Sequence, residues 1–137
     1  MEKAMREFWD KNEFIQIYSP KFMPSPSESG AELFSVEYFG KKAYLAQSPQ
    51  FYKQMAMASG FEKIFEIGPV FRANPSHTVR HDTEFTMIDM EISYIDSHEE
   101  VMKLEEEWIQ YFIKRIKEEY GEEIKKTYGV DVVIPKI

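Results

Sequence analysis

The residues best suited to chemistry lie in one stretch, Phe65 to Tyr94, where polar groups interrupt two apolar segments. Ile64 to Arg72 and Glu84 to Ile95 are rich in β-branched and aromatic residues, which is typical of strands. Ala73 to Thr83 contains Asn, Pro, Ser and Asp, which is typical of a loop. The pattern therefore predicts a β-hairpin with an unusually long tip.

Side chains of the second strand alternate between two faces, because successive strand residues point in opposite directions. One face combines an aromatic ring, two carboxylates and a small polar group, on Phe85, Met87, Asp89, Glu91 and Ser93. The other face is predicted to be core and carries Thr86, Ile88, Met90 and Ile92. Arg72 ends the first strand, within cross-strand reach of the polar row. A cation, a ring and carboxylates on one face indicate a site for a polar ligand.

The composition predicts one domain with a sizeable core, since the chain has 137 residues and is 43% hydrophobic. A formal net charge of −7 argues against a surface that binds nucleic acid all over, so any RNA contact must be local. The absence of cysteine excludes disulfides and thiolate metal sites. Without a signal-peptide core or an apolar run of transmembrane length, we expect a cytoplasmic protein with no membrane contact.

Periodicity and turn residues predict the elements that precede the site. Apolar residues at helical spacing predict an amphipathic helix over Met1 to Lys11, followed by an extended segment from Phe14 to Ser19. Imperfect alternation around Gly40 predicts a short hairpin, formed by Leu33 to Phe39 and Lys42 to Ala46.

A helix is expected from Pro49 to Ser59, with Ser48 as its N-cap. Gln50 and Lys53 lie one turn apart near its start, so both side chains can converge on one ligand. Solvation of the helix surface is the more common role of such residues.

A long helix is predicted after the hairpin, at about 98–120. Ser97 and Glu100 form a capping box, and apolar residues continue at three- and four-residue steps to Gly121. Its glutamates are interpreted as a solvated face.

Three segments resemble motifs of the class II aminoacyl-tRNA synthetases, in the order that the family has them. FRANPSHTVRHDTEFTMIDMEI resembles motif 2, and QSPQFYKQ resembles the amino-acid-binding segment of the aspartyl branch. FIQIYSPKF resembles motif 1, with its proline at Pro20. Within the class, the resemblance is strongest to aspartyl-tRNA synthetases of the archaeal and eukaryotic type.

The resemblance implies an α+β fold, an antiparallel β-sheet flanked by helices, as a partial class II catalytic domain. Residues 1–137 correspond to the N-terminal part of that domain. Motif 1 falls at about 8–22, the amino-acid-binding segment at 47–54 and motif 2 at about 64–95.

The resemblance also implies roles at the nucleotide end of the site. Arg72 is the expected catalytic residue, in contact with the α-phosphate of ATP and the substrate carboxylate, while Phe85 stacks on adenine. Asn74 stands where the family commonly has glutamate; an amide can still hydrogen-bond adenine but lacks the charge.

The same resemblance places L-aspartate against four residues. Gln50 approaches the amino acid, Asp89 holds its ammonium group, and Glu28, with Glu32 as the alternative, meets the same group. Lys53 pairs with the side-chain carboxylate. A fixed ammonium in a partly desolvated pocket favours a carboxylate over an amide, and asparaginyl relatives tend to have a non-basic residue there.

Two further contact regions are implied by the resemblance. The tRNA acceptor end is matched to His77, Arg80 and His81, for which a solvated polar turn is the alternative. A metal site built on the two histidines is disfavoured, because no third ligand is evident nearby. A homodimer interface is matched to motif 1, with Phe8, Trp9, Phe14, Ile17 and Pro20 as candidates; the alternative is an ordinary core helix.

The expected function is ATP-dependent activation of L-aspartate to aspartyl-adenylate, followed by transfer to tRNA, in an enzyme that uses Mg²⁺. No arginine follows a glycine-rich strand near the C-terminus, so motif 3 is absent and the Mg²⁺ site is expected to be incomplete in this chain. Two alternatives stay open: a non-catalytic or assembly paralogue of the synthetase core, and an asparaginyl or asparagine-synthesising relative.

Overall fold

The computed structural model describes residues 1–26, 32–75 and 78–136. The chain forms two compact units: Gln16–Ser93 is one, and Met1–Ile15 together with Tyr94–Ile137 is the other. The fold combines helices with antiparallel sheets and is α+β, as predicted. Within the described ranges, no helix is both long and apolar enough to cross a membrane.

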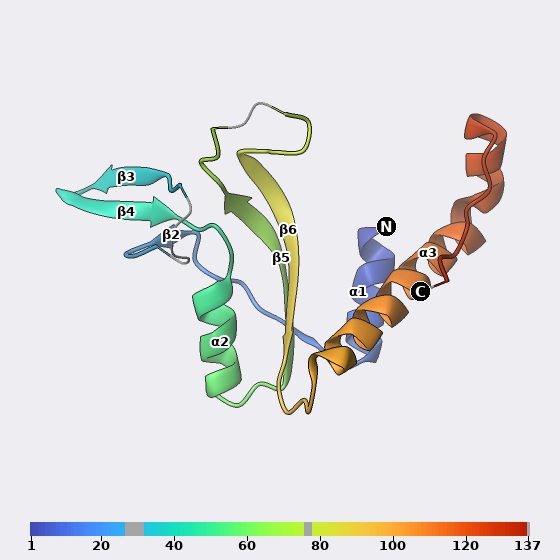
Figure 1. The fold of residues 1–137 in the computed structure, drawn as a ribbon, viewed down its shortest axis with the longest axis horizontal. Helices are drawn as coiled ribbons and strands as arrows, with labels where there is room; N and C mark the ends of the chain where they lie inside the picture. The colour runs from blue at the N-terminus through green and yellow to red at the C-terminus, as the bar shows by residue number, and fades with distance from the viewer. Residues whose placement is uncertain (27–31, 76–77, 137) are drawn as a thin grey trace. The chain divides into compact units, whose positions relative to one another are not determined.

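The main sheet of the Gln16–Ser93 unit is built on the predicted hairpin (Figure 1). β5 (Lys63–Phe71) pairs antiparallel with β6 (Glu84–Ile92), from Lys63 opposite Ile92 to Phe71 opposite Glu84. The short β1 (Ile15–Gln16) lies on the other side of β5. The Ile17 N–H donates to the Phe65 carbonyl at 2.9 Å. The long-tipped hairpin predicted from the sequence is confirmed.

A second sheet has the order β2-β4-β3 and contains the other predicted hairpin. Its strands are β2 (Phe22–Met23), β3 (Ser35–Tyr38) and β4 (Lys41–Leu45). Ala46, just after β4, joins the two sheets: its N–H donates to the Lys21 carbonyl at 3.0 Å, and its carbonyl accepts from the Phe71 N–H at 2.9 Å. The residues that follow Ala46 are therefore fixed against the end of β5.

Those residues lead into α2 (Gln50–Ala58), which matches the predicted helix to within one residue at each end. The Ser48 hydroxyl accepts a hydrogen bond from the Gln50 N–H at 3.3 Å, and the Lys53 N–H donates to the Pro49 carbonyl at 2.9 Å. The start of α2 is thus tied down next to the junction of the two sheets.

The prediction that Thr86 and Ile88 belong to the core is wrong. Thr86 is exposed and Ile88 is 38% exposed, whereas Phe85, Met87 and Asp89 on the opposite face are half-buried. The polar face is the better covered of the two because α2 reaches it through Lys53. The alternation of side chains assigned the residues to the two faces correctly, but it did not predict which face is covered by other parts of the chain.

The other unit packs α1 (Glu2–Lys11) against α3 (His98–Tyr128). Trp9 stacks on Trp108 with ring centroids 5.2 Å apart, and Phe8 lies 5.6 Å from Tyr111. Three of the predicted dimer residues, Phe8, Trp9 and Phe14, are buried within the chain itself. In this chain they are core residues, while Ile17 is half-buried and Pro20 exposed.

The third helix begins as predicted but ends later. Ser97 and Glu100 form the capping box, with both reciprocal hydrogen bonds present. The helix continues through Gly121 to Tyr128, and Gly129 is its C-cap, with a φ of 71° that suits glycine. A glycine inside a helix costs only about 1 kcal/mol relative to alanine, and the Glu and Lys residues around Gly121 favour the helix.

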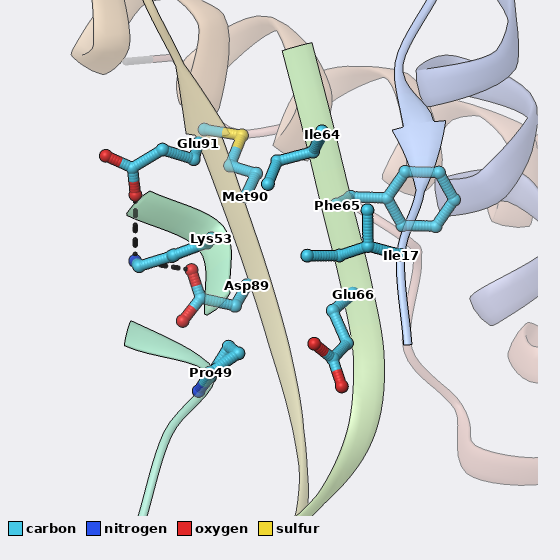
Figure 2. A pocket seen from close by; sticks show the side chains of 9 residues that line it. All are labelled: Ile17, Pro49, Lys53, Ile64, Phe65, Glu66, Asp89, Met90 and Glu91. Atoms are coloured by element: carbon cyan, nitrogen blue, oxygen red, sulfur yellow. Dashed lines mark hydrogen bonds and ion pairs between the residues drawn. The ribbon is translucent and has the colours of Figure 1, made fainter. Parts of the chain in front are cut away.

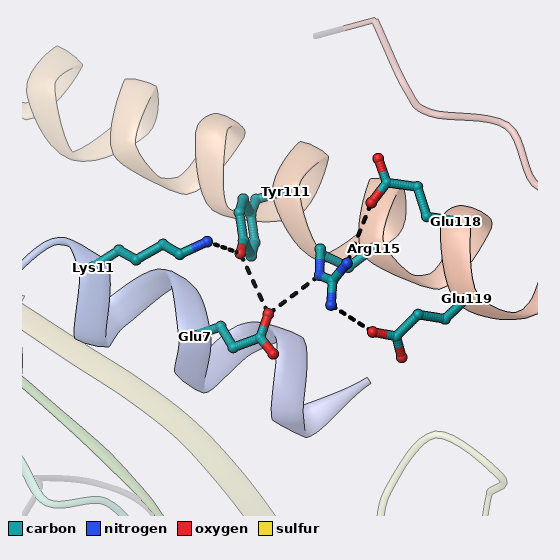
Figure 3. A network of polar contacts seen from close by, with 6 residues as sticks. All are labelled: Glu7, Lys11, Tyr111, Arg115, Glu118 and Glu119. Atoms are coloured by element: carbon teal, nitrogen blue, oxygen red, sulfur yellow. Dashed lines mark hydrogen bonds and ion pairs between the residues drawn. The ribbon is translucent and has the colours of Figure 1, made fainter.

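A polar network crosses from α1 to α3 along this packed interface (Figure 3). Glu7 Oε2 accepts from Arg115 Nε at 3.2 Å and from the Tyr111 hydroxyl at 3.3 Å. Lys11 Nζ donates to the same hydroxyl at 2.6 Å. Burial alone would raise the pKa of Glu7, but the hydrogen bond and charge of Arg115 outweigh it and hold that pKa below its ordinary value of 4.5.

Replacing Arg115 with Met should lower the melting temperature of this chain at about pH 7 and have less effect at about pH 3. A carboxyl group with a lowered folded-state pKa contributes stability above its unfolded pKa and loses it as the pH falls through the folded pKa. Thermal unfolding followed by circular dichroism at both pH values checks this.

Lys117→Met, which removes the same charge from an exposed position of α3, serves as the control and should change the melting temperature little at either pH. A constant difference between Arg115→Met and the wild type at both pH values would contradict a contribution through Glu7.

Candidate functional site

Lys53 extends from α2 toward β6 and meets the polar face of the main sheet at Asp89 and Glu91 (Figure 2). Its Nζ is 2.9 Å from Asp89 Oδ1 and 3.0 Å from Glu91 Oε2. The side chains of Lys53 and Asp89 are 14% and 18% exposed, and that of Glu91 is 31% exposed. Helix α2 therefore places the ammonium group of Lys53 between the carboxylates of Asp89 and Glu91 on β6.

The two carboxylates keep this lysine charged. Burial alone would lower the pKa of Lys53, but the hydrogen bonds and charges of Asp89 and Glu91 outweigh it and raise the pKa above the ordinary value of 10.5. Lys53 is consequently a permanent cation across the physiological pH range, in a partly desolvated setting where its charge acts strongly.

Arg72 and Phe85 form the second part of the site, next to the hairpin loop. The guanidinium carbon of Arg72 lies 5.5 Å from the centroid of the Phe85 ring, which is a cation–π distance. The Arg72 N–H donates to the Thr83 carbonyl at 2.9 Å, which extends the ladder by one pair beyond β5. The predicted cross-strand approach of Arg72 to the polar row is confirmed.

Glu66 is a buried carboxylate that the sequence analysis missed. Its residue is 4% exposed, and its Oε1 accepts from the Ser19 N–H at 3.1 Å and the Ser19 hydroxyl at 2.9 Å. Lys21 Nζ forms an ion pair with the same oxygen. A carboxylate inside the apolar strand KIFEIGPVF was the available signal.

Glu66 stands directly opposite Asp89 in the register of β5 and β6. Like charges at opposite positions of a sheet repel each other, and here each carboxylate has its own lysine: Lys21 for Glu66 and Lys53 for Asp89. Glu66, Asp89, Glu91 and Lys53 line one small hollow together with Pro49 and apolar residues (Figure 2).

Gln47 is a second residue that the sequence analysis did not single out. It is 1% exposed, and among the described residues neither its amide nitrogen nor its amide oxygen has a hydrogen-bond partner. Buried polar groups without partners are uncommon and costly, so this amide is not ordinary packing.

The remaining predicted residues lie at the edges of this arrangement or outside the described ranges. Gln50 begins α2, one turn before Lys53. Asn74 and Arg80 are exposed in the loop, and His81 Nδ1 is 2.6 Å from the Thr78 hydroxyl. Glu32 is exposed, and its carbonyl accepts from the Ala73 N–H at 3.3 Å. Glu28 and His77 fall outside the residues that the structure describes.

The arrangement suits a ligand that carries charges of both signs. Lys53 and Arg72 offer two cations on one sheet face, and Asp89 and Glu91 offer carboxylates beside the first of them. Phe85 adds a ring next to the second cation. Anionic groups, an ammonium group and a flat ring could each find a partner on this face.

Comparisons with known proteins identify the same family for nearly the whole chain. The sequence model of the family "tRNA synthetases class II (D, K and N)" matches residues 1–136. The aspartate–tRNA(Asp/Asn) ligase of Methanopyrus kandleri is 48% identical over 134 residues, which make up 98% of this chain and 30% of that protein. The aspartate–tRNA(Asp) ligase of Pyrococcus abyssi is 49% identical over 123 residues, which are 90% of this chain and 28% of that protein.

The structural likeness agrees. The asparaginyl-tRNA synthetase from Pyrococcus horikoshii, solved in complex with asparaginyl-adenylate, superposes with a TM-score of 0.83 and 38% sequence identity. The match covers 91% of this chain and 28% of that one. The chain thus spans about 30% of the length of the curated relatives it matches. It belongs to the class II tRNA synthetases (D, K and N).

Proposed function

We propose that this chain forms the part of an aspartate–tRNA ligase that binds L-aspartate and the α-phosphate of ATP. The observation that carries the proposal is Lys53, a charged, partly desolvated lysine held on the site face by Asp89 and Glu91. The similarity to aspartate–tRNA ligases at 48% and 49% identity supports it.

Lys53 can accept a third partner without releasing the two it has. An ammonium group has three hydrogen-bond donors, and within the described residues two of them point to Asp89 and Glu91. The third is proposed to hold the side-chain carboxylate of aspartate. The α-ammonium group of the substrate then pairs with Asp89, so that each charge of the amino acid meets an opposite charge.

Arg72 is proposed to act at the reacting centre. An oxygen of the aspartate α-carboxylate attacks the α-phosphorus of ATP, the new P–O bond forms, and pyrophosphate leaves with the bond electrons. The guanidinium group contacts the carboxylate and the α-phosphate and stabilises the negative charge that builds at phosphorus. Phe85 offers its ring to adenine, next to the cation that it already contacts.

The rest of the proposed cycle transfers the aspartyl group to tRNA in a cytoplasmic homodimer. Arg80 and His81 in the hairpin loop are proposed to meet the acceptor end. ATP is proposed to arrive with Mg²⁺, but in the described ranges no group of three or more His, Cys, Asp or Glu side chains is placed so that it could hold a metal ion. These residues therefore do not fit a metal ion by themselves.

An asparagine-specific enzyme is the second candidate, and one observation favours it. The asparaginyl-tRNA synthetase of P. horikoshii is similar to this chain in fold and 38% identical in sequence. A cation at position 53 weighs against asparagine, because a neutral amide leaves the lysine charge less well compensated than a carboxylate does.

Lys53→Leu, made in the longest natural protein that contains this chain, should raise the KM for aspartate by about 100-fold or more. Removing one member of a buried charged contact costs about 3 kcal/mol, and 1.4 kcal/mol corresponds to a factor of ten. The KM for ATP should change little. Aspartate-dependent ATP/pyrophosphate exchange measures both constants.

Lys42→Leu, at an exposed position of β4, is the matched control and should leave both constants near the wild-type values. An equal rise of the two KM values in the Lys53 variant would count against the assigned role. Asparagine-dependent exchange that exceeds aspartate-dependent exchange in the wild type would favour the second candidate.

Arg72→Ala should cut adenylate formation by about 100-fold or more, since one preorganised donor at a developing charge contributes roughly that factor. Single-turnover formation of aspartyl-adenylate, with protein in excess over ATP, measures the step directly. Near-normal rates in the variant would exclude the role assigned to Arg72. Arg80→Ala, exposed in the loop, should leave this step unchanged and lower only transfer to tRNA.

A further inference from the structure

Glu66 belongs to a closed circuit of contacts around Lys53. From Glu66 the circuit runs through its ion pair to Lys21, and from the Lys21 carbonyl to the Ala46 N–H at 3.0 Å. Ala46 is followed by Gln47, Ser48 and Pro49, which lead directly into α2 and to Lys53. From Lys53 the circuit returns through Asp89, which stands opposite Glu66 in the sheet.

We propose that Glu66 is a positioning residue: by holding Lys21 it fixes the start of α2 and so sets where Lys53 lies against Asp89 and Glu91. Glu66 itself needs no contact with a ligand for this. Its Oε1 takes two hydrogen bonds from Ser19 and the ion pair from Lys21, so one buried oxygen holds the segment before β2.

Burial makes this contact a rigid one. The Glu66 side chain is 4% exposed and that of Lys21 is 23% exposed, so water cannot readily take the place of Lys21 at the buried carboxylate. Removing one charge from a buried pair leaves the other uncompensated, and the remaining group moves toward solvent. Movement of Lys21 shifts its carbonyl, and with it Ala46 and the start of α2.

Gly68 shows how closely this contact is fitted to the strand. A Cβ at position 68 would lie 3.3 Å from Glu66 Oε1 and 3.4 Å from both Cε and Nζ of Lys21. Any side chain there would press on the pair, so a glycine leaves the space that the Lys21 ammonium uses to reach Glu66. An alanine at this position requires the Glu66 carboxylate to shift by a few tenths of an ångström, and it changes no charge.

The effect on substrate rests on the proposed aspartate site, in which Lys53 holds the side-chain carboxylate. Glu66→Gln keeps an acceptor for Ser19 but removes the charge that faces Lys21. In the longest natural protein that contains this chain, it should raise the KM for aspartate by about tenfold, or about 1.4 kcal/mol, as expected when a charged contact to the substrate is weakened but kept. The KM for ATP and the kcat per active site should stay near wild type.

Three further variants test the route of the effect. Glu66→Gln combined with Lys21→Met should recover part of the lost affinity for aspartate, because the lone buried charge is gone. Gly68→Ala should raise the KM for aspartate in the same direction but by less, and it keeps the test open if Glu66→Gln does not fold. Glu62→Gln, exposed just before β5, is the matched control and should change nothing.

Active-site titration separates positioning from simple destabilisation. A purely structural role lowers the fraction of active protein and leaves the KM for aspartate unchanged in both Glu66→Gln and Gly68→Ala, and that result would overturn the proposal. The proposal would also be overturned if Glu66→Gln combined with Lys21→Met had the same KM for aspartate as Glu66→Gln alone.

A measurement without substrate tests the position of Lys53 independently of the KM for aspartate. The pKa of Lys53, measured by NMR on protein with ¹³Cε-labelled lysine and assigned with Lys53→Arg, should fall in Glu66→Gln as the lysine moves from its carboxylates. An unchanged Lys53 signal in both Glu66→Gln and Gly68→Ala contradicts the positioning role. If the wild-type protein does not use aspartate but Glu66→Gln still shifts the Lys53 signal, the aspartate function has failed and the positioning role stands.

Discussion

Two carboxylates face each other across the central strand pair, and the rest of the site depends on how that repulsion is offset. Glu66 and Asp89 are direct partners in the register of β5 and β6. Neither strand offsets its own charge; the cations come from Lys21, which precedes β2, and from Lys53 on α2. The two carboxylates are thus compensated only when the segment before β2 and helix α2 are both in place. The ion pairs link these two segments to the sheet.

Local patterns were sufficient to predict most of the elements. The hairpin, the helix over α2 and the capping box at Ser97 all depend on residues close in sequence, where turn chemistry and periodicity act directly. Strict alternation also placed Phe85, Asp89 and Glu91 on one face, since a period of two leaves no other arrangement. These predictions did not require knowledge of distant contacts.

The features that could not be predicted depend on contacts between distant segments. Which face of β6 is covered depends on where α2 lies, so the assignment of Ile88 to the core failed. The role of Glu66 depends on Ser19 and Lys21, which precede it by more than 40 residues and face it only in the folded chain. Gly121 did not end α3, because its small local cost is outweighed by the helix on either side.

The charge balance around Lys53 bears on the kind of ligand that fits. One ammonium between two carboxylates leaves a net negative charge beside a cation that stays protonated, because its pKa is raised. A simple anion would be repelled by the carboxylates, and a simple cation would leave the lysine without a partner of its own in the ligand. A ligand with an ammonium group at one end and a carboxylate at the other meets opposite charge at both ends, and an amino acid with an acidic side chain has that form. In the proposed aspartate site, selectivity would therefore depend on the spacing of three charged side chains more than on any one of them, and the segments that hold Lys53 in place would matter as much as the lysine itself.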